Sequence, residues 1–186
     1  MRPKSACYPR SVVRGRKNPG YLTFASRLKK ARKTAGDSRL ATMQRAGFAH
    51  STLAGWEEGE RIPRIDAVER VAYAMSLSPA FLAFGIQTDA APMAKGLRSD
   101  GVGQRLADER TARGLSVLAV AKLAGLSHTA VGNVERGTMP TLATAEALAK
   151  ALDLSPGWLA YGIGPRELPQ RRSRPAPAQP PPTASL

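Results

Sequence analysis

The sequence predicts an all-α protein built from two similar units of five short helices each. An internal repeat is the first indication, because GFAHSTLAGWEEG at 47–59 and GLSHTAVGNVERG at 125–137 place Gly, His, a hydroxyl, an aliphatic residue, Glu and Gly at matching positions. Composition is the second, since 42% hydrophobic but only 5% aromatic residues suit small helical cores of Ala, Leu, Val and Ile. The third is apolar spacing typical of helices in both halves.

The repeat extends over most of the two halves. Equivalent residues are offset by 78 as far as Gly59 and Gly137, and by 77 from Pro63 and Pro140 onward, so one loop differs by a single residue. The closing stretches SPAFLAFGI and SPGWLAYGI correspond as well. We interpret the pattern as a tandem duplication within 186 residues, a length that accommodates two small domains.

The predicted domain organisation follows from the repeat and from local composition. Two helical units are expected at 21–86 and 102–164, joined by a linker at 87–101. Residues 1–20 carry six basic residues and no acidic one, and residues 165–186 are rich in Pro and Arg. We therefore expect a flexible basic arm at one end and a disordered, extended tail at the other.

The first three helices of each unit are predicted from their end signals. Helix one is expected at 22–35 or 102–113, before a glycine suited to a left-handed C-terminal cap. Ser38 and Ser116 are natural N-caps for helix two, which stops at the next glycine. Helix three follows after three residues.

The last two helices are predicted from apolar spacing and from Ser-Pro pairs. Helix four carries apolar residues at positions i, i+3, i+4 and i+7. These are Ile65, Val68, Val71, Ala72 and Met75 in the first unit and Leu142, Ala145, Leu148, Ala149 and Leu152 in the second. Ser78-Pro79 and Ser155-Pro156 then supply the N-cap and the first residue of a final short helix.

Helices two and three of each unit are joined by a tight turn that contains glycine, which predicts a helix-turn-helix able to place its third helix in a DNA major groove. The stretches SVLAVAKLAGLSHTAVGNVERG and PTLATAEALAKALDLSPGWLAYG resemble the Cro/phage-repressor (XRE-type) helix-turn-helix family. AGFAHSTLAGWEEGERIPRIDAVERVAYAMSLSPAFLAFG shows the same pattern in the first unit. The resemblance covers residues 21–86 and 102–163, and it implies two tandem five-helix, lambda-repressor-like DNA-binding domains.

The resemblance implies that positions one, two and six of helix three face the edges of DNA bases. These positions hold His50, Ser51 and Gly55 in the first unit and His128, Thr129 and Asn133 in the second. Asn pairs well with adenine, and hydroxyl and imidazole groups also bond to base edges. The alternative is that the histidines are merely exposed polar residues. The opposite face, with Leu53, Trp56, Val131 and Val134, is expected in the core.

Other side chains are expected to bind the DNA backbone or to hold the fold. Candidate phosphate ligands are Ser38, Arg39, Arg61, Arg64, Ser116 and Arg136. Arg39 and Val117 stand where the resembled family commonly has a phosphate-binding Gln. The family's helix-three Glu pairs with an Arg of helix one, which implies structural ion pairs of Arg32 with Glu57 and of Arg110 with Glu135 rather than catalytic carboxylates.

The two units are expected to contribute differently to DNA binding. Ala49 replaces the usual hydroxyl cap of the first recognition helix and Gly55 lies inside that helix, each at a cost of about 1 kcal/mol. Residues 21–85 hold 10 basic and 6 acidic residues, whereas residues 102–164 hold 6 and 5. We therefore expect the first unit and its arm to bind mainly phosphates and the second unit to read more of the sequence.

Charge and motifs together indicate the class of function. The net charge of +14 favours a polyanionic partner. The sequence shows no GxSxG, HExxH, P-loop or CxxC motif, and the single cysteine leaves no Cys-based metal site. We expect a regulator of transcription that binds double-stranded DNA without catalysis, cofactor or metal, more specifically a repressor of a bacterium or mobile element. The alternative is an antitoxin or antiactivator that masks a protein partner.

The same reasoning extends to location and stoichiometry. No apolar run approaches about 18 residues, so we expect a cytoplasmic, nucleoid-associated protein with no membrane partner. From 86 to 101 the chain spans about 53 Å extended and about 20–24 Å as a coil, against about 34 Å between successive major-groove faces. One chain is thus expected to reach two half-sites as a pseudo-dimeric monomer. The alternative is a homodimer through exposed Trp158 or Tyr161, two residues that also suit the core.

Overall fold

The computed structural model describes residues 21–88 and 96–167, and within these ranges it contains ten α-helices, one short 3-10 helix and no strand. The elements in chain order are α1 (Leu22–Thr34), α2 (Arg39–Ala46), α3 (His50–Glu57), α4 (Ile65–Ala74), α5 (Pro79–Phe84), the 3-10 helix η2 (Arg98–Gly101), α6 (Val102–Ala112), α7 (Val117–Ala124), α8 (His128–Glu135), α9 (Leu142–Ala151) and α10 (Pro156–Tyr161). The prediction of an all-helical fold is confirmed. The predicted basic arm at 1–20 lies outside the described residues.

Local capping chemistry explains why α2 and α7 begin and end where the sequence predicts. The Ser38 hydroxyl accepts the Ala41 N–H at 3.1 Å, and the Ser116 hydroxyl accepts the Ala119 N–H at 3.1 Å. Both helices end at glycines in the left-handed conformation, which an L side chain rarely adopts. The helices before them, α1 and α6, each end one residue earlier than predicted.

The remaining helix starts differ from one another in their side-chain caps. Ser127 caps α8 by accepting the Ala130 N–H at 3.1 Å, whereas Ala49 at the start of α3 has no side chain that accepts a hydrogen bond. Ser78 and Ser155 occupy the predicted N-cap positions of α5 and α10, but their hydroxyls make no capping bond. The proline that follows each serine fixes the first helical φ angle and has no N–H, so that position leaves no unpaired donor.

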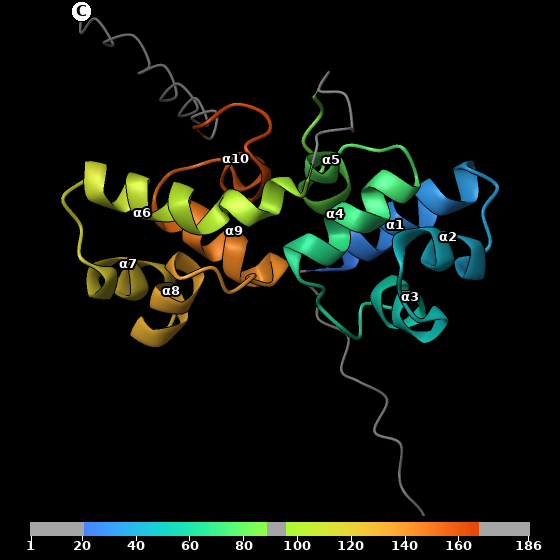
Figure 1. Cartoon of the computed structure of the whole chain (residues 1–186), viewed down its shortest axis with the longest axis horizontal. Coiled ribbons are helices and arrows are strands. Elements are labelled where there is room, and N and C mark those ends of the chain that lie inside the picture. Colours follow the sequence, from blue (N-terminus) through green and yellow to red (C-terminus); the bar gives the residue numbers. More distant parts are fainter. Residues whose placement is uncertain (1–20, 89–95, 168–186) are drawn as a thin grey trace, which may run out of the picture.

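Helices α1–α5 and α6–α10 pack against each other through one continuous cluster of buried residues. Figure 1 shows the two sets side by side, with α5 and α10 in contact in the middle of the molecule. The Ile65 N–H donates to the Pro140 carbonyl at 3.0 Å, and the Leu142 N–H donates to the Pro63 carbonyl at 3.0 Å. These bonds tie the start of α4 to the start of α9.

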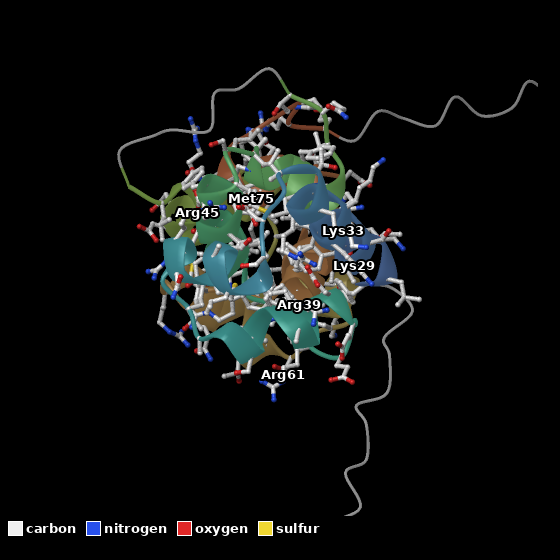
Figure 2. The ribbon with its side chains drawn as sticks, turned by 90° about the vertical axis from the view of Figure 1, so that its right-hand side faces the viewer. Lys29, Lys33, Arg39, Arg45, Arg61 and Met75 are labelled. Atoms are coloured by element: carbon white, nitrogen blue, oxygen red, sulfur yellow. The ribbon has the colours of Figure 1, made fainter. Side chains whose placement is uncertain are left out.

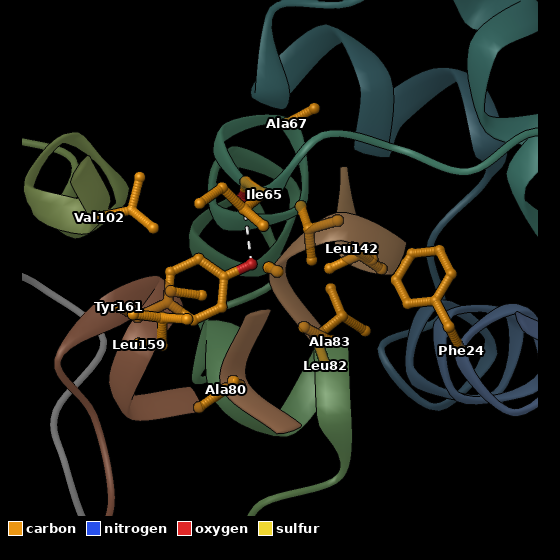
Figure 3. Packing of buried hydrophobic residues seen from close by; sticks show 14 of the residues in the cluster. Phe24, Ile65, Ala67, Ala80, Leu82, Ala83, Val102, Leu142, Leu159 and Tyr161 are labelled. Atoms are coloured by element: carbon orange, nitrogen blue, oxygen red, sulfur yellow. Dashed lines mark hydrogen bonds between the residues drawn. The ribbon is translucent and has the colours of Figure 1, made fainter. Parts of the chain in front are cut away.

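Tyr161 closes this contact from α10, and its placement corrects one expectation. Its side chain is 1% exposed, and its hydroxyl donates to the Ile65 carbonyl at 3.1 Å (Figure 3). A homodimer through an exposed Tyr161 is therefore wrong, because the other set of helices already covers this residue. Trp158 is half-buried, and the Arg166 guanidinium lies 5.6 Å from the centre of its ring.

The end of the predicted linker is part of the fold rather than a spacer. The Glu69 carboxylate, which is fully buried, accepts the N–H groups of Arg98 at 2.7 Å and Ser99 at 2.9 Å. The Tyr73 hydroxyl donates to the same carboxylate at 2.6 Å. Residues 98–101 are thereby held as η2 against α4, and the linker boundary at 101 is corrected to before residue 98.

The predicted start of the C-terminal tail at 165 also requires correction. The Ser155 N–H donates to the Arg166 carbonyl at 2.8 Å, and the Arg166 guanidinium pairs with Glu109 at 2.7 Å. An isolated β-bridge joins Leu154 to Glu167. Residues 165–167 therefore belong to the folded part, and the rest of the predicted tail, 168–186, lies outside the described residues.

Candidate nucleic-acid interface

The predicted recognition helices, α3 and α8, lie on the same side of the molecule. They form its lower side in Figure 1, and α3 again lies at the bottom of the turned view in Figure 2. Their inner faces are buried, with Leu53 and Trp56 of α3 and Val131 and Val134 of α8 in the core, as predicted. Burial of these side chains leaves the opposite faces of both helices for solvent or a ligand.

The predicted base-contacting residues differ in how accessible the structure leaves them. Ser51, His128 and Thr129 are exposed, and Gly55 and Asn133 are half-buried. His50 is the first residue of α3, but its side chain lies outside what the structure describes. The second recognition helix therefore presents an imidazole, a hydroxyl and an amide along one helix face, a set able to bond to base edges.

Each recognition helix is tied to the first helix of its set by an arginine fork. Arg32 Nε donates to Glu57 Oε1 at 2.6 Å and its Nη2 donates to Oε2 at 3.2 Å. Arg110 makes the same two bonds to Glu135, also at 2.6 and 3.2 Å. A bidentate pair of this kind fixes orientation as well as distance, so it positions the helix rather than performing chemistry.

The same arginines also hold the turn that leads into the second helix. Arg32 Nη1 donates to the Asp37 carbonyl at 2.9 Å, and Arg110 Nη1 donates to the Leu115 carbonyl at 2.9 Å. Since both bonds go to backbone, the arrangement tolerates Asp at one position and Leu at the other. Each fork thus joins three segments of its helix-turn-helix.

Arg39, predicted as a phosphate ligand, is occupied by an ion pair in this structure. Its Nε donates to Glu57 Oε2 at 2.7 Å, and its Nη2 lies 3.8 Å from Glu58. Its side chain is 33% exposed, so it lies at the edge of the buried Glu57 pair rather than free in solvent. The second set of helices has Val117 at this position, so Glu135 is left with one cation where Glu57 has two.

The pKa of Glu57 reflects these neighbours. Burial acts to raise the pKa of its carboxyl, but hydrogen bonds from Arg32 and Arg39, together with their positive charges, outweigh burial and hold the pKa below its usual value. A carboxylate that stays ionised in this way keeps both arginines in place over the ordinary range of pH.

Among the other predicted phosphate ligands, Ser38, Ser116, Arg64 and Arg136 bond within the protein, whereas Arg61 forms no ion pair with the described residues. Ser38 and Ser116 are exposed but use their hydroxyls as caps, and Arg64 pairs with Asp66 at 3.1 Å. Arg61 is exposed and, among the described residues, forms no ion pair. Arg136 donates from Nη2 to Asn133 Oδ1 at 2.6 Å.

The contact between Arg136 and Asn133 and the contact between Arg39 and Glu57 were not anticipated from the sequence. Asn133 and Arg136 are three residues apart, a spacing that brings helix side chains together, so the first contact carried a readable signal. Arg39 and Glu57 lie on different helices 18 residues apart, and only the packing of α2 against α3 brings them together.

The described residues offer little support for other kinds of site. Within residues 21–88 and 96–167, no group of three or more His, Cys, Asp or Glu is arranged to hold a metal ion. In the same ranges, no single helix is long and apolar enough to cross a membrane. Helices α7 and α8 reach that length and apolar composition only when taken together, and a bend of 116° separates them.

Taken together, a capped helix, a glycine turn and a second helix with a polar outer face define a helix-turn-helix of the DNA-binding kind. Residues 106–159 match the family model described as Helix-turn-helix, from Leu106 in α6 to Leu159 in α10. No curated protein and no solved structure matched the chain. The matched segment is therefore a DNA-binding helix-turn-helix domain of the type usually found in transcriptional regulators, and double-stranded DNA is the partner that this type implies.

Proposed function

We propose that α1–α5 form a second helix-turn-helix domain like the matched one, and that the chain is a sequence-specific transcriptional repressor. The main support for this proposal is that α3 and α8 hold equivalent places in the two sets of helices and lie on one side of the molecule (Figure 1). The repeated cap, glycine turn and arginine fork support this assignment.

The contact between the two sets supports a paired mode of binding. Ile65 bonds to Pro140 and Leu142 bonds to Pro63, and these partners are equivalent positions of the repeat. Ile65 corresponds to Leu142 in the repeat, and Pro63 corresponds to Pro140, so the same contact is made twice in opposite directions. Reciprocal contacts of this kind are typical of a two-fold interface. Two readers related in this way suit inverted half-sites centred about 34–36 Å apart. One chain would then engage two unequal half-sites.

Charge supports unequal roles for the two domains. Residues 21–85 carry 10 basic against 6 acidic residues, and residues 102–164 carry 6 against 5. The first domain has the greater attraction for phosphates, which supplies affinity without sequence preference. The second has the capped helix and the amide of Asn133, which favour base reading.

Repression follows from occupancy alone. A pair of readers on a promoter excludes other proteins from the same stretch of duplex, and this requires no further surface. Activation would require an additional contact with the polymerase, for which the described residues offer no specific support.

The proposal is tested by selecting bound sequences from a random DNA pool with the full-length chain. We expect two inverted, unequal half-sites, with binding that weakens as salt concentration rises. A chain that shows no preference for its best selected duplex over a scrambled competitor at low salt contradicts the proposal, and that outcome favours the masking of a protein partner instead.

A further inference from the structure

The sixth position of the two recognition helices differs in a way that the helix sequences alone do not explain. Asn133 occupies this position in α8, whereas α3 has Gly55, which has no side chain to reach a base. The space over Gly55 is nevertheless filled. A methyl group at Gly55 would lie 3.4 Å from Arg61 Cδ, 3.5 Å from its Cγ and 3.8 Å from its Nε.

Arg61 comes from the loop that is one residue longer in the first repeat. Three residues separate Gly59 from Pro63, whereas two separate Gly137 from Pro140. The longer loop folds back onto α3, because the N–H groups of Glu60 and Arg61 both donate to the Gly55 carbonyl, at 2.9 and 3.2 Å. The backbone of Arg61 is thus fixed beside the sixth position of the helix.

The guanidinium of Arg61 is available for a ligand. The residue is exposed and lies at the lower edge of Figure 2, beyond α3. Among the described residues it forms no ion pair, in contrast to Arg39 and Arg64, which bond to carboxylates. Its stem packs on a glycine that leaves room for it, so the side chain is directed along the outer face of the recognition helix.

The second recognition helix also holds an arginine at this place, from a different position in the sequence. Arg136 donates to the Asn133 side chain at 2.6 Å, and its Nη1 would lie 3.3 Å from a methyl group at Gly132. The residue equivalent to Arg136 in the first repeat is Glu58, which cannot serve in the same way. Both helices therefore carry one guanidinium beside the sixth position, supplied by non-equivalent residues.

We propose that Arg61, not Gly55, reads the base that faces the sixth position of α3, and that this base is guanine. A planar guanidinium donates two parallel hydrogen bonds to the O6 and N7 acceptors of guanine, the commonest specific contact between a side chain and a base. This reassigns Gly55 from reader to support and Arg61 from phosphate ligand to base reader. The inference rests on the proposed DNA-binding function.

The test compares sequences selected from a random DNA pool by the full-length wild-type chain and by R61A, R61K and R64A. The half-site of the first domain is the one whose preference is unaffected by N133A. In that half-site we expect R61A to lose the preference for a single guanine by about 5- to 150-fold, with the rest of the site unchanged. R61K keeps the charge but not the fork, so it should lose most of the same preference.

The matched control is R64A, which removes a second exposed arginine of the same loop. We expect it to weaken binding to all sequences alike without changing the selected site. A gain of function completes the set: R61A combined with G55N should shift the preferred base from guanine to adenine, since the three atoms nearest to a Cβ at Gly55 all belong to the removed arginine. Thermal melts check that each variant is folded.

Three outcomes overturn the inference. A wild-type half-site without guanine at this position does so, and so does an R61A chain that keeps the guanine while binding all DNA more weakly, as a phosphate ligand would. A wild-type chain that selects no sequence removes the proposed function, and the inference with it.

Discussion

The two proposed recognition helices, α3 and α8, share one scaffold but differ in how each is held and in what it presents. In α3 the N-cap is Ala49, and the carboxylate beneath the helix, Glu57, has two arginine partners. In α8 the N-cap is Ser127, and the corresponding carboxylate, Glu135, has one. Stabilising contacts are thus distributed differently between the two helices: α3 lacks a side-chain cap but has an additional ion pair beneath it.

The largest difference is expected at the two carboxylates. Glu57→Ala should lower the free energy of unfolding by about 3–5 kcal/mol, because it removes the buried carboxylate that pairs with two arginines. Glu135→Ala should cost less, since the Glu135 side chain is 14% exposed and pairs with only one arginine. Urea unfolding of both variants measures the difference, with Glu60→Ala as an exposed control. Equal losses at Glu57 and Glu135 would show that Arg39 adds nothing.

Acid should remove part of the same stabilisation. Because the pKa of Glu57 is lower in the folded chain than in the unfolded chain, its ionisation stabilises the fold above the unfolded value of about 4.3, and this contribution is lost as pH falls through the folded value. The wild-type chain should therefore lose more stability than Glu57→Gln as pH falls below about 4.3. Urea unfolding at a series of pH values measures this, and parallel curves would contradict the assignment.

A smaller effect on DNA separates reading from phosphate binding. Asn133→Ala should weaken binding by about 1–3 kcal/mol on the selected duplex and leave binding to a scrambled duplex unchanged. The reason is that the amide is proposed to contact a base, whereas phosphate contacts are shared by all sequences. Fluorescence anisotropy measures the affinity for each duplex. An equal loss of affinity on both would show that Asn133 contacts the DNA phosphates rather than a base.

The smallest expected effect is at the N-caps of α3 and α8, where each helix can be given the cap residue of the other. The backbone of Ala49, at φ −67° and ψ 140°, is already extended like that of Ser127, at φ −71° and ψ 149°. Ala49→Ser should therefore stabilise the fold by about 1 kcal/mol, and Ser127→Ala should destabilise it by a similar amount. Thermal melts measure both, and an Ala49→Ser chain no more stable than wild type would show that α3 is not limited by its cap.

Features set by neighbouring residues were mostly predictable from the sequence, whereas contacts between distant segments were predicted only where the family resemblance implied them, as for Arg32 with Glu57 and Arg110 with Glu135. The caps at Ser38 and Ser116 and the glycines that end both helices depend only on local conformation. The Glu69 carboxylate binds the N–H groups of Arg98 and Ser99, which are about 30 residues away in the sequence. Because composition does not indicate such a distant contact, this segment was predicted as part of the linker. Burial of Tyr161 required knowing that the two sets of helices meet through α5 and α10.

The candidate site shows the same division. The family resemblance implied the outer positions of both helices, and the structure leaves Ser51, His128 and Thr129 exposed there. The sequence did not indicate that Arg39 pairs with Glu57 or that Arg61 lies over Gly55, because both contacts depend on how a loop or a helix packs against α3.

In the proposed mode of binding, the contact between the two sets of helices, not the linker, fixes the distance between two recognition helices on one duplex. The most direct test is binding of the full-length chain to its selected duplex and to the same duplex with about 5 base pairs inserted between the half-sites, half a helical turn. We expect one chain per duplex and at least about a tenfold loss of affinity on insertion, because the second half-site is turned to the far side. Unchanged affinity after the insertion, or two chains on each duplex, would contradict it.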